Sequence, residues 1–223
     1  MTDVTDKSSV RPQLLFGPFS AVGLALILAG CSTTKKPAEL VDVQEAIPGI
    51  VLDIRYATTN NFTGQQLYPF SKCYLRRAAA TKLRAAQTEL AATGYGLKIF
   101  DGYRPLSVQW KMWEIYPHPG YVADPRKGSR HNRGAAVDVT LIRLADGAEL
   151  LMPTPYDDFT EKAHRDFMDL PAEAIRNREL LEQVLTKHGF TGLKTEWWHF
   201  DDKDWRKYSI LNLDVSETKS SSP

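Results

Sequence analysis

The sequence predicts an α+β fold, in which a central antiparallel sheet is flanked by helices within a single domain. Two stretches, 75–92 and 171–188, repeat apolar residues at the spacing of one helix face. Short runs with strand composition lie between them, and Asp146-Gly147 is typical of a hairpin turn between antiparallel strands. The length of 223 residues, of which 43% are hydrophobic, suits one domain with a substantial core.

Further strands and helices are expected at particular positions of the chain. Strands are expected where β-type residues cluster, at 50–56, 97–100 and 135–143. The first and last helices are expected to end at Gly94 and Gly189, which are placed to cap them. Another helix can begin at Pro105, because a backbone N–H at the first helical position has no acceptor within the helix and proline lacks that N–H. We expect its apolar side to consist of Trp110, Met112, Trp113 and Ile115.

The first 30 residues have the composition of a secretory leader, with an apolar run over 14–28 after Lys7 and Arg11. The segment Leu28-Ala-Gly-Cys31 resembles the cleavage box of bacterial lipoproteins, in which the cysteine becomes the acylated first residue. The alternative is a transmembrane anchor, but the run is interrupted and short for a span of ~20 residues. We therefore expect a lipoprotein signal peptide over 1–30, lipidation of Cys31, and a periplasmic protein held to the bacterial envelope by that anchor.

The remaining chain is expected to comprise a polar tether over 31–42, a folded domain over 43–215 and a disordered tail over 216–223. With Cys31 acylated, Cys73 is the one thiol left, so no intramolecular disulfide is possible and a buried apolar role is expected. The formal net charge is +1 and no basic block occurs. Charge therefore gives no support to a nucleic-acid partner, and no protein partner can be inferred.

Two short stretches, 129–138 and 196–199, supply the residues of a catalytic zinc site. Such a site has three protein ligands, an open fourth position for water, and a base beside it. We interpret His131, Asp138 and His199 as the ligands and Glu196 as the base. Asp138 lies within an apolar strand, where an ionised carboxylate is costly unless a cation pairs with it.

Strand geometry places one condition on this interpretation. In a regular strand successive side chains face opposite sides, so Asp138 projects from the polar face of 135–143. Glu196 and His199 are three residues apart and would face opposite sides of a regular strand. If both serve one metal, the chain must twist or leave the strand between them.

The pattern Ser-x-His-x-x-Gly-x-Ala-x-Asp over 129–138, followed by Glu-x-x-His over 196–199, closely resembles the zinc D-alanyl-D-alanine dipeptidases. The resemblance covers about 53–200 and includes Asp101-Gly-Tyr-Arg-Pro105 and Asn61-Phe-Thr-Gly64. It implies that 43–215 is a dipeptidase domain with one Zn²⁺ per chain. The implied reaction is hydrolysis of D-Ala-D-Ala or a similar D,D-dipeptide. Because the protein is expected to be secreted, cell-wall turnover or D-alanine salvage is the expected role.

The resemblance also implies roles for three further residues. It makes Arg104 the residue that stabilises the oxyanion, and it makes Ser129 and Tyr56 contacts of the substrate. From the residues alone, a surface pair of Arg104 with Asp101 is favoured, Ser129 is only a loop hydroxyl, and Tyr56 could equally be a core tyrosine.

Two other functions are compatible with the same residues. One is a D,D-carboxypeptidase or endopeptidase on peptidoglycan stem peptides, with the same zinc chemistry in a more open cleft. The other is a zinc-stabilised binding module without catalysis. The presence of a base at Glu196 counts against the second.

Overall fold

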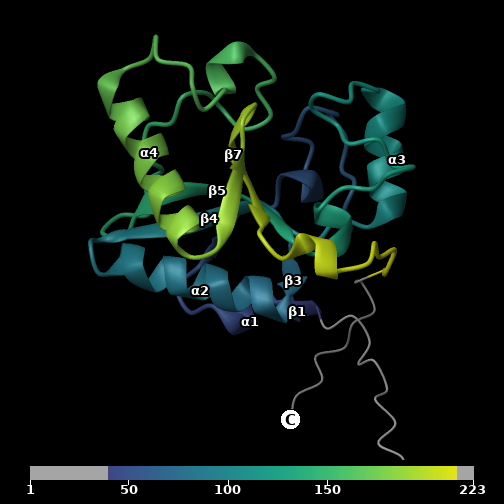
Figure 1. Ribbon diagram of the computed structural model, residues 1–223, viewed down its shortest axis with the longest axis horizontal. Coiled ribbons are helices and arrows are strands. Elements are labelled where there is room, and N and C mark those ends of the chain that lie inside the picture. The colour runs from purple at the N-terminus through teal and green to yellow at the C-terminus, as the bar shows by residue number, and fades with distance from the viewer. Residues whose placement is uncertain (1–39, 215–223) are drawn as a thin grey trace, which may run out of the picture. The chain divides into compact units, whose positions relative to one another are not determined.

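The computed structural model describes residues 40–214 (Figure 1). The expected signal peptide, Cys31, most of the tether and the expected tail over 216–223 lie outside the described residues. The strands are β1 (Leu40–Asp42), β2 (Val51–Leu52), β3 (Tyr74–Arg76), β4 (Tyr95–Asp101), β5 (Ala136–Arg143), β6 (Phe190–Leu193) and β7 (Glu196–Asp202). The α-helices are α1 (Val43–Ala46), α2 (Arg77–Ala91), α3 (Leu106–Ile115) and α4 (Ala172–Lys187). Within the described part of the chain, every helix is too short or too polar to cross a membrane.

The main sheet has five strands in the order β2-β4-β5-β7-β6. All of its pairs are antiparallel except β2 and β4, which are parallel. The α+β class is confirmed, but one edge of the sheet departs from the expected antiparallel arrangement. The physical reason is the connection: the chain between β2 and β4 passes through α2, and such a crossover allows two strands to run parallel.

The described fold begins before the expected boundary at residue 43. Residues 40–42 form β1, which pairs antiparallel with β3 in a two-stranded sheet. The side chain of Asp42 also accepts a hydrogen bond from the backbone N–H of Gln44 and so caps α1. The last three residues assigned to the tether therefore belong to the folded domain.

Helices α2 and α4 contact one another and pack on the sheet, whereas α3 lies on the other side of β7 from α4 (Figure 1). The expected apolar side of α3 is wrong in two places, since Trp110 and Ile115 are each 41% exposed. The buried face instead consists of Val108, Gln109 and Met112. A glutamine is buried there because its side chain serves the site described below.

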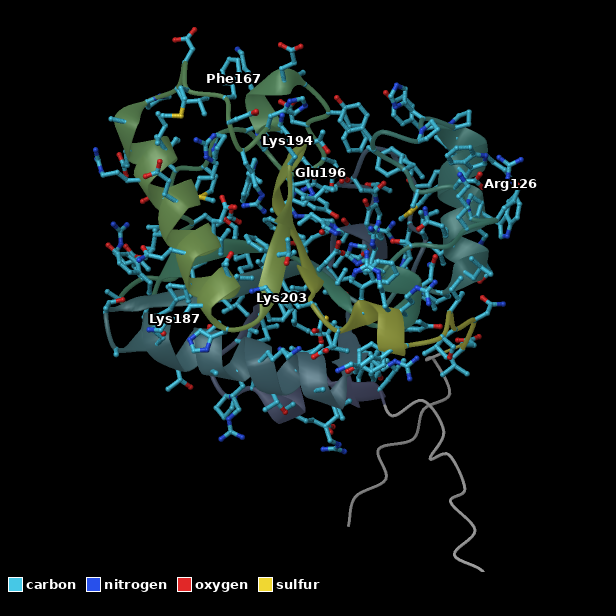
Figure 2. All side chains as sticks on the ribbon, viewed as in Figure 1. Arg126, Phe167, Lys187, Lys194, Glu196 and Lys203 are labelled. Atoms are coloured by element: carbon cyan, nitrogen blue, oxygen red, sulfur yellow. The ribbon has the colours of Figure 1, made fainter. Side chains whose placement is uncertain are left out.

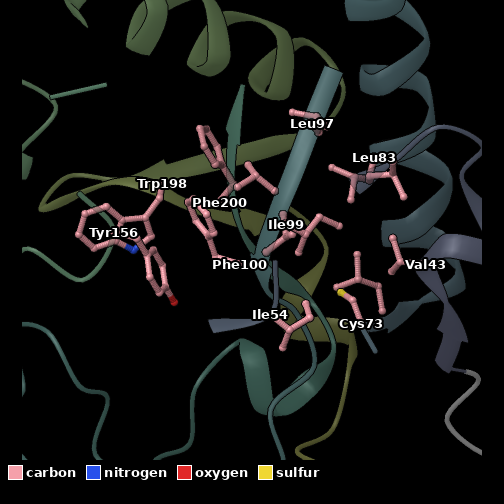
Figure 3. Close-up of a cluster of buried hydrophobic side chains, with 14 of the residues drawn as sticks. Val43, Ile54, Cys73, Leu83, Leu97, Ile99, Phe100, Tyr156, Trp198 and Phe200 are labelled. Atoms are coloured by element: carbon pink, nitrogen blue, oxygen red, sulfur yellow. The ribbon is translucent and has the colours of Figure 1, made fainter. Parts of the chain in front are cut away.

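The core lies between the sheet and its helices. Figure 3 shows Leu83 of α2 beside Leu97 and Ile99 of β4, all with no exposed surface. Cys73 belongs to the same cluster and is a free, buried cysteine, as expected. At the other end of the cluster Tyr156 packs against Trp198, with ring centroids 5.3 Å apart. The site is therefore built on a rigid apolar support.

Candidate metal centre and active site

The register of the sheet places three polar residues in a row. Asp101 of β4 lies opposite Asp138 of β5, and Asp138 lies opposite His199 of β7. Directly opposite residues on paired strands share one face. A bulge at residue 100 of β4 keeps Asp101 in this row. All three side chains are at least nine-tenths buried.

The fourth polar residue, His131, comes from the loop that precedes β5. It begins the short 3-10 turn η2 (His131–Arg133), which ends at Gly134. Gly134 has φ +65°, a conformation that favours glycine, and a side chain there would collide with Leu40. This turn reverses the chain, so that His131 meets Asp138 and His199 on the adjacent strands.

The potential ligand atoms of these residues form a small triangle. Nε2 of His131 lies 3.1 Å from Nδ1 of His199 and 3.4 Å from Oδ1 of Asp138. The third side, from Nδ1 of His199 to Oδ1 of Asp138, measures 3.0 Å. With Zn–N bonds of about 2.0–2.1 Å, tetrahedral zinc ligands lie about 3.3 Å apart. The triangle therefore fits one face of a zinc tetrahedron.

The outer nitrogens of both imidazoles face fixed acceptors. Nδ1 of His131 lies 2.7 Å from the carbonyl oxygen of Gly102, and Nε2 of His199 lies 2.9 Å from Oδ1 of Asp201. In the neutral tautomers these nitrogens donate, so both lone pairs point toward the oxygen of Asp138. Two lone pairs and a carboxylate oxygen that face one another repel, so a positive charge is needed between them.

A proton is one such charge. Burial alone would lower the pKa of His199, but its hydrogen bonds to Asp138 and Asp201 raise that pKa to about 10. Although burial would raise the pKa of Asp138, the two histidines hold it well below its ordinary value. A metal ion bound by the three atoms would supply the charge and release the proton.

A bulge in β7 resolves the geometric difficulty with Glu196. β6 and β7 pair Gly192 with Phe200, and then Leu193 with Glu196, so residues 197–199 of β7 have no opposite residues on β6. This interruption turns Glu196 toward the metal side, where its Oε2 lies 3.8 Å from Nδ1 of His199. Figure 2 shows Glu196 near the tip of the β6–β7 hairpin.

The electrostatic surroundings raise the proton affinity of Glu196. Burial, together with the negative charges of Asp138 and Asp157, raises the pKa of Glu196 to about 8. The carboxylate accepts no hydrogen bond from the described part of the chain and lies beside the ligand triangle. It can therefore accept a proton from a group bound there.

Arg104 is paired with Asp101 as the sequence allowed, but the pair is buried rather than on the surface. Nε and Nη2 of Arg104 donate to Oδ2 of Asp101 at 3.0 and 2.7 Å, and Nη1 donates to Gln109 at 3.0 Å. Burial alone would lower the pKa of Arg104, but Asp101 raises it well above its ordinary value. Gln109 is thus buried in α3 in order to orient this guanidinium.

A buried asparagine that sequence reasoning missed joins the loops of Arg104 and His131. Nδ2 of Asn132 donates to the carbonyl oxygen of Arg104 at 2.8 Å, and its Oδ1 accepts from the backbone N–H of Ser129 at 2.7 Å. Oγ of Ser129 accepts from the backbone N–H of His131 at 3.2 Å. Ser129 is therefore buried beside the first histidine and keeps its hydroxyl proton free.

Two further residues were also missed, Tyr156 and Asp157. The hydroxyl of Tyr156 donates to Oδ2 of Asp138 at 2.9 Å, and the hydroxyl of Tyr56 lies 3.1 Å from Oδ1 of Asp157. Burial is the main cause that raises the pKa of Asp157 to about 7. Asp157 has φ +63°, which is unusual for a residue other than glycine, but nothing in the surrounding sequence signals this.

The buried His–Asp–His set, the free carboxylate beside it and the nearby guanidinium are typical of metal-dependent hydrolases. Comparison with known proteins specifies the class further. The family model described as D-ala-D-ala dipeptidase matches residues 36–217. This chain therefore belongs to the D-ala-D-ala dipeptidase family and is a peptidase.

Individual relatives agree with this assignment. The D-alanyl-D-alanine dipeptidase of Escherichia coli (strain K12) is 37% identical over 173 residues, which cover 78% of this chain and 89% of that protein. The D-alanyl-D-alanine dipeptidase of Enterococcus faecalis (strain ATCC 700802 / V583) is 32% identical over 181 residues, 71% of this chain and 88% of that one. A solved structure of the vancomycin resistance D,D-pentapeptidase VanY in complex with Zn(II) has 16% identity and a TM-score of 0.38, covering 60% of this chain and 75% of that chain. The family assignment rests on the sequence matches.

Proposed function

We propose that this protein hydrolyses D-Ala-D-Ala or a similar D,D-dipeptide with one Zn²⁺ held by His131, Asp138 and His199. The observation that carries the proposal is the convergence of two imidazole lone pairs and one carboxylate oxygen beside the free carboxylate of Glu196. The family assignment supports the substrate class. When bound, zinc would polarise the scissile carbonyl and lower the pKa of a water molecule toward ~7.

Glu196 is proposed to move the proton. Its carboxylate takes a proton from the attacking water and passes it to the nitrogen of the leaving amino acid. A pKa raised by burial gives the carboxylate the proton affinity that this step needs, and a bound cation would lower that pKa into the working range. A positioned general base commonly contributes about 10²–10⁴ in rate.

Arg104 is proposed to stabilise the oxyanion. Three of its five N–H groups are used by Asp101 and Gln109, which leaves one N–H on Nη1 and one on Nη2. Asp101 and Gln109 hold the guanidinium before substrate binds, so no reorganisation is required as negative charge develops.

Ser129 and Tyr56 are proposed to contact the dipeptide, whose two ends bind to Asp157 and Ser129. Asp157 is a partly buried carboxylate beside Tyr56, and an ammonium group would supply its missing counter-charge and keep it ionised. The free hydroxyl proton of Ser129 can donate to the substrate carboxylate. Because Ser129 and Arg104 are buried and Asp157 is partly buried, a short substrate fits the site better than a polymer.

The substrate is tested by incubating the zinc-loaded protein with D-Ala-D-Ala, with L-Ala-L-Ala and with a stem pentapeptide that ends in D-Ala-D-Ala, and by measuring released alanine. The proposal expects kcat/KM to be highest for the free D,D-dipeptide. Comparable values for the dipeptide and the pentapeptide would indicate a carboxypeptidase, and absence of cleavage of all three would contradict the proposal.

The proposed location is the periplasm, with attachment through a lipid on Cys31. Leu28-Ala-Gly-Cys31 precedes residues 36–217 of the family match and supports a processed leader. In that location the proposed role is D-alanine salvage during cell-wall turnover. Cys31→Ser should release the protein from the membrane fraction or leave it unprocessed. Unchanged processing and fractionation would contradict acylation at this residue.

A further inference from the structure

One buried arginine, Arg165, contacts the bulge of β7 from the connection between β5 and α4. Its Nε donates to the carbonyl oxygen of Leu193 at 2.8 Å. Its Nη2 donates to the carbonyl oxygens of Trp197 and His199, each at 2.9 Å. Its backbone N–H donates to the carbonyl oxygen of Lys194 at 2.9 Å. Arg165 therefore joins β6 and β7 at the place where their pairing is interrupted.

The need for such a contact follows from the register. β6 has no residues opposite 197–199, so it offers no backbone N–H groups to that part of β7. Buried carbonyl groups without donors are costly. A guanidinium presents several donors in one plane and can take the place of the missing N–H groups.

We propose that Arg165 is a positioning residue for the active site. By holding the bulge, it keeps Glu196 and His199 on the same side of β7, although their spacing would place them on opposite sides of a regular strand. Arg165 is linked to the site through the carbonyl group of His199 and therefore acts through other residues. This inference rests on the proposed function, because it concerns the same metal site.

Gly192 of β6 supports the proposal independently. A Cβ at this position would lie 2.4 Å from Cζ and Nε of Arg165, so any side chain there would require the guanidinium to shift. Gly192 is absent from the residues with positive φ, so its backbone conformation does not require glycine. The guanidinium also lies over the ring of Phe200, with Cζ 4.3 Å from the centroid. The lack of a side chain at Gly192 thus leaves a space beside β6, and the guanidinium of Arg165 fills it.

The test compares the full-length protein with its Arg165→Met, Arg165→Lys and Gly192→Ala variants. Zinc affinity is measured by competition with a chromophoric chelator, kcat and KM with D-Ala-D-Ala, and melting after removal of the metal. We expect zinc affinity and kcat to fall about 10- to 100-fold in all three variants, as for other residues that orient metal ligands. Lysine keeps the positive charge, but its single ammonium group cannot reach all three carbonyl groups. Zinc affinity and kcat should therefore stay below wild type in Arg165→Lys.

Two control variants separate positioning from stability. Lys82→Met removes a partly buried ion pair with Asp202, in which Nζ and Oδ1 lie 2.5 Å apart at the far end of β7. Glu182→Gln removes the ion-pair partner of Arg165, 3.3 Å away, but leaves its bonds to the carbonyl groups. Both variants should keep zinc affinity and kcat within about twofold of wild type, even where melting is lowered.

Several results would overturn the proposal. One is a folded Arg165→Met or Arg165→Lys protein that keeps wild-type zinc affinity and kcat. Another is a Lys82→Met protein that loses as much zinc affinity and kcat as the Arg165 variants. If the methionine variant does not fold, the lysine and Gly192→Ala variants decide. A wild-type protein that binds zinc but does not cleave D-Ala-D-Ala contradicts the proposed function, while its zinc affinity still tests the role of Arg165.

Discussion

Strands β5 and β7 lie side by side, and each presents one of the proposed ligands in a different way. β5 is regular: Asp138 takes its place in the alternation of the strand and lies directly opposite His199. β7 is interrupted opposite β6, and this interruption brings Glu196 to the side of His199. The position of one ligand therefore follows from strand geometry alone, whereas the placement of the base relative to its neighbouring ligand depends on residues outside the strand.

The two strands also differ in which groups form hydrogen bonds with them near the site. Around Asp138 the hydrogen bonds come from side chains at the site, Tyr156 and His199. Around residues 197–199 they come from Arg165, which reaches the backbone. Changes near β5 should accordingly affect the metal directly, while changes near β7 can separate metal binding from proton transfer.

The largest effect is expected from a change in β5. Asp138→Asn keeps the size of the side chain but removes the negative charge between the two histidines. Zinc should be lost at micromolar free metal, and kcat/KM should fall by more than about 10³-fold, since loss of residues that only orient the metal ligands costs about 10- to 100-fold. Metal analysis of the purified protein and the D-Ala-D-Ala assay measure both. Retention of stoichiometric zinc would show that Asp138 is not a ligand.

A smaller effect is expected at Arg104, which belongs to neither strand. Arg104→Lys keeps the charge beside Asp101 but removes the two free N–H groups. We expect kcat to fall about 10²–10³-fold with unchanged zinc content, as when an oxyanion donor is removed. Arg55→Lys is a suitable control, because Arg55 pairs with Asp53 and makes no contact with the metal ligands. An Arg104→Lys enzyme within a few-fold of wild type would place oxyanion stabilisation elsewhere.

The smallest effect concerns stability as a function of pH. The folded pKa of Asp157, about 7, lies above the ordinary value of ~3.9, so folding takes up a proton there. This contribution is fully present below about pH 4 and is lost as pH rises to about 7. Glu196, with a pKa of about 8, acts in the same direction. Metal-free protein should therefore melt at lower temperature as pH rises from 5 to 8, and Asp157→Asn should reduce the slope. An unchanged slope in this variant would contradict the raised pKa.

The sequence was sufficient for the regular part of the fold. The periodicity of 75–92 and 171–188 predicted α2 and α4, and alternation predicted β5 with Asp138 on its polar face. The parallel pairing of β2 was missed because two residues carry too little pattern to show a direction. The buried face of α3 was wrong because Gln109 is buried for its hydrogen bond to Arg104, which hydrophobicity cannot indicate.

The candidate site was predictable where residue types are chemically distinctive. Two histidines, one aspartate in an apolar strand and one nearby glutamate suffice to suggest a metal, and the structure brings these four together. The bulge was recognisable only as a geometric necessity, because Gly192 and Arg165, which contact one another at the interruption, show no sequence pattern that relates them to Glu196. Asp157 was missed because it lies in a loop, with a left-handed backbone conformation that the sequence does not indicate.

The central claim is that two residues of β7 have different roles: His199 is a metal ligand, and Glu196 accepts and then donates the proton. Glu196→Gln tests it, because glutamine keeps the size of the side chain and removes its basicity. The matched variant is His199→Gln, which removes the proposed ligand three residues away on the same strand. Zinc content, melting temperature and kcat with D-Ala-D-Ala are measured on both proteins.

We expect Glu196→Gln to retain stoichiometric zinc and near wild-type melting while kcat falls about 10²–10⁴-fold. His199→Gln should lose zinc and activity together. If Glu196→Gln loses its zinc, Glu196 is a ligand and the assignment of roles is wrong. If it keeps full activity with zinc bound, the proton is taken by another group.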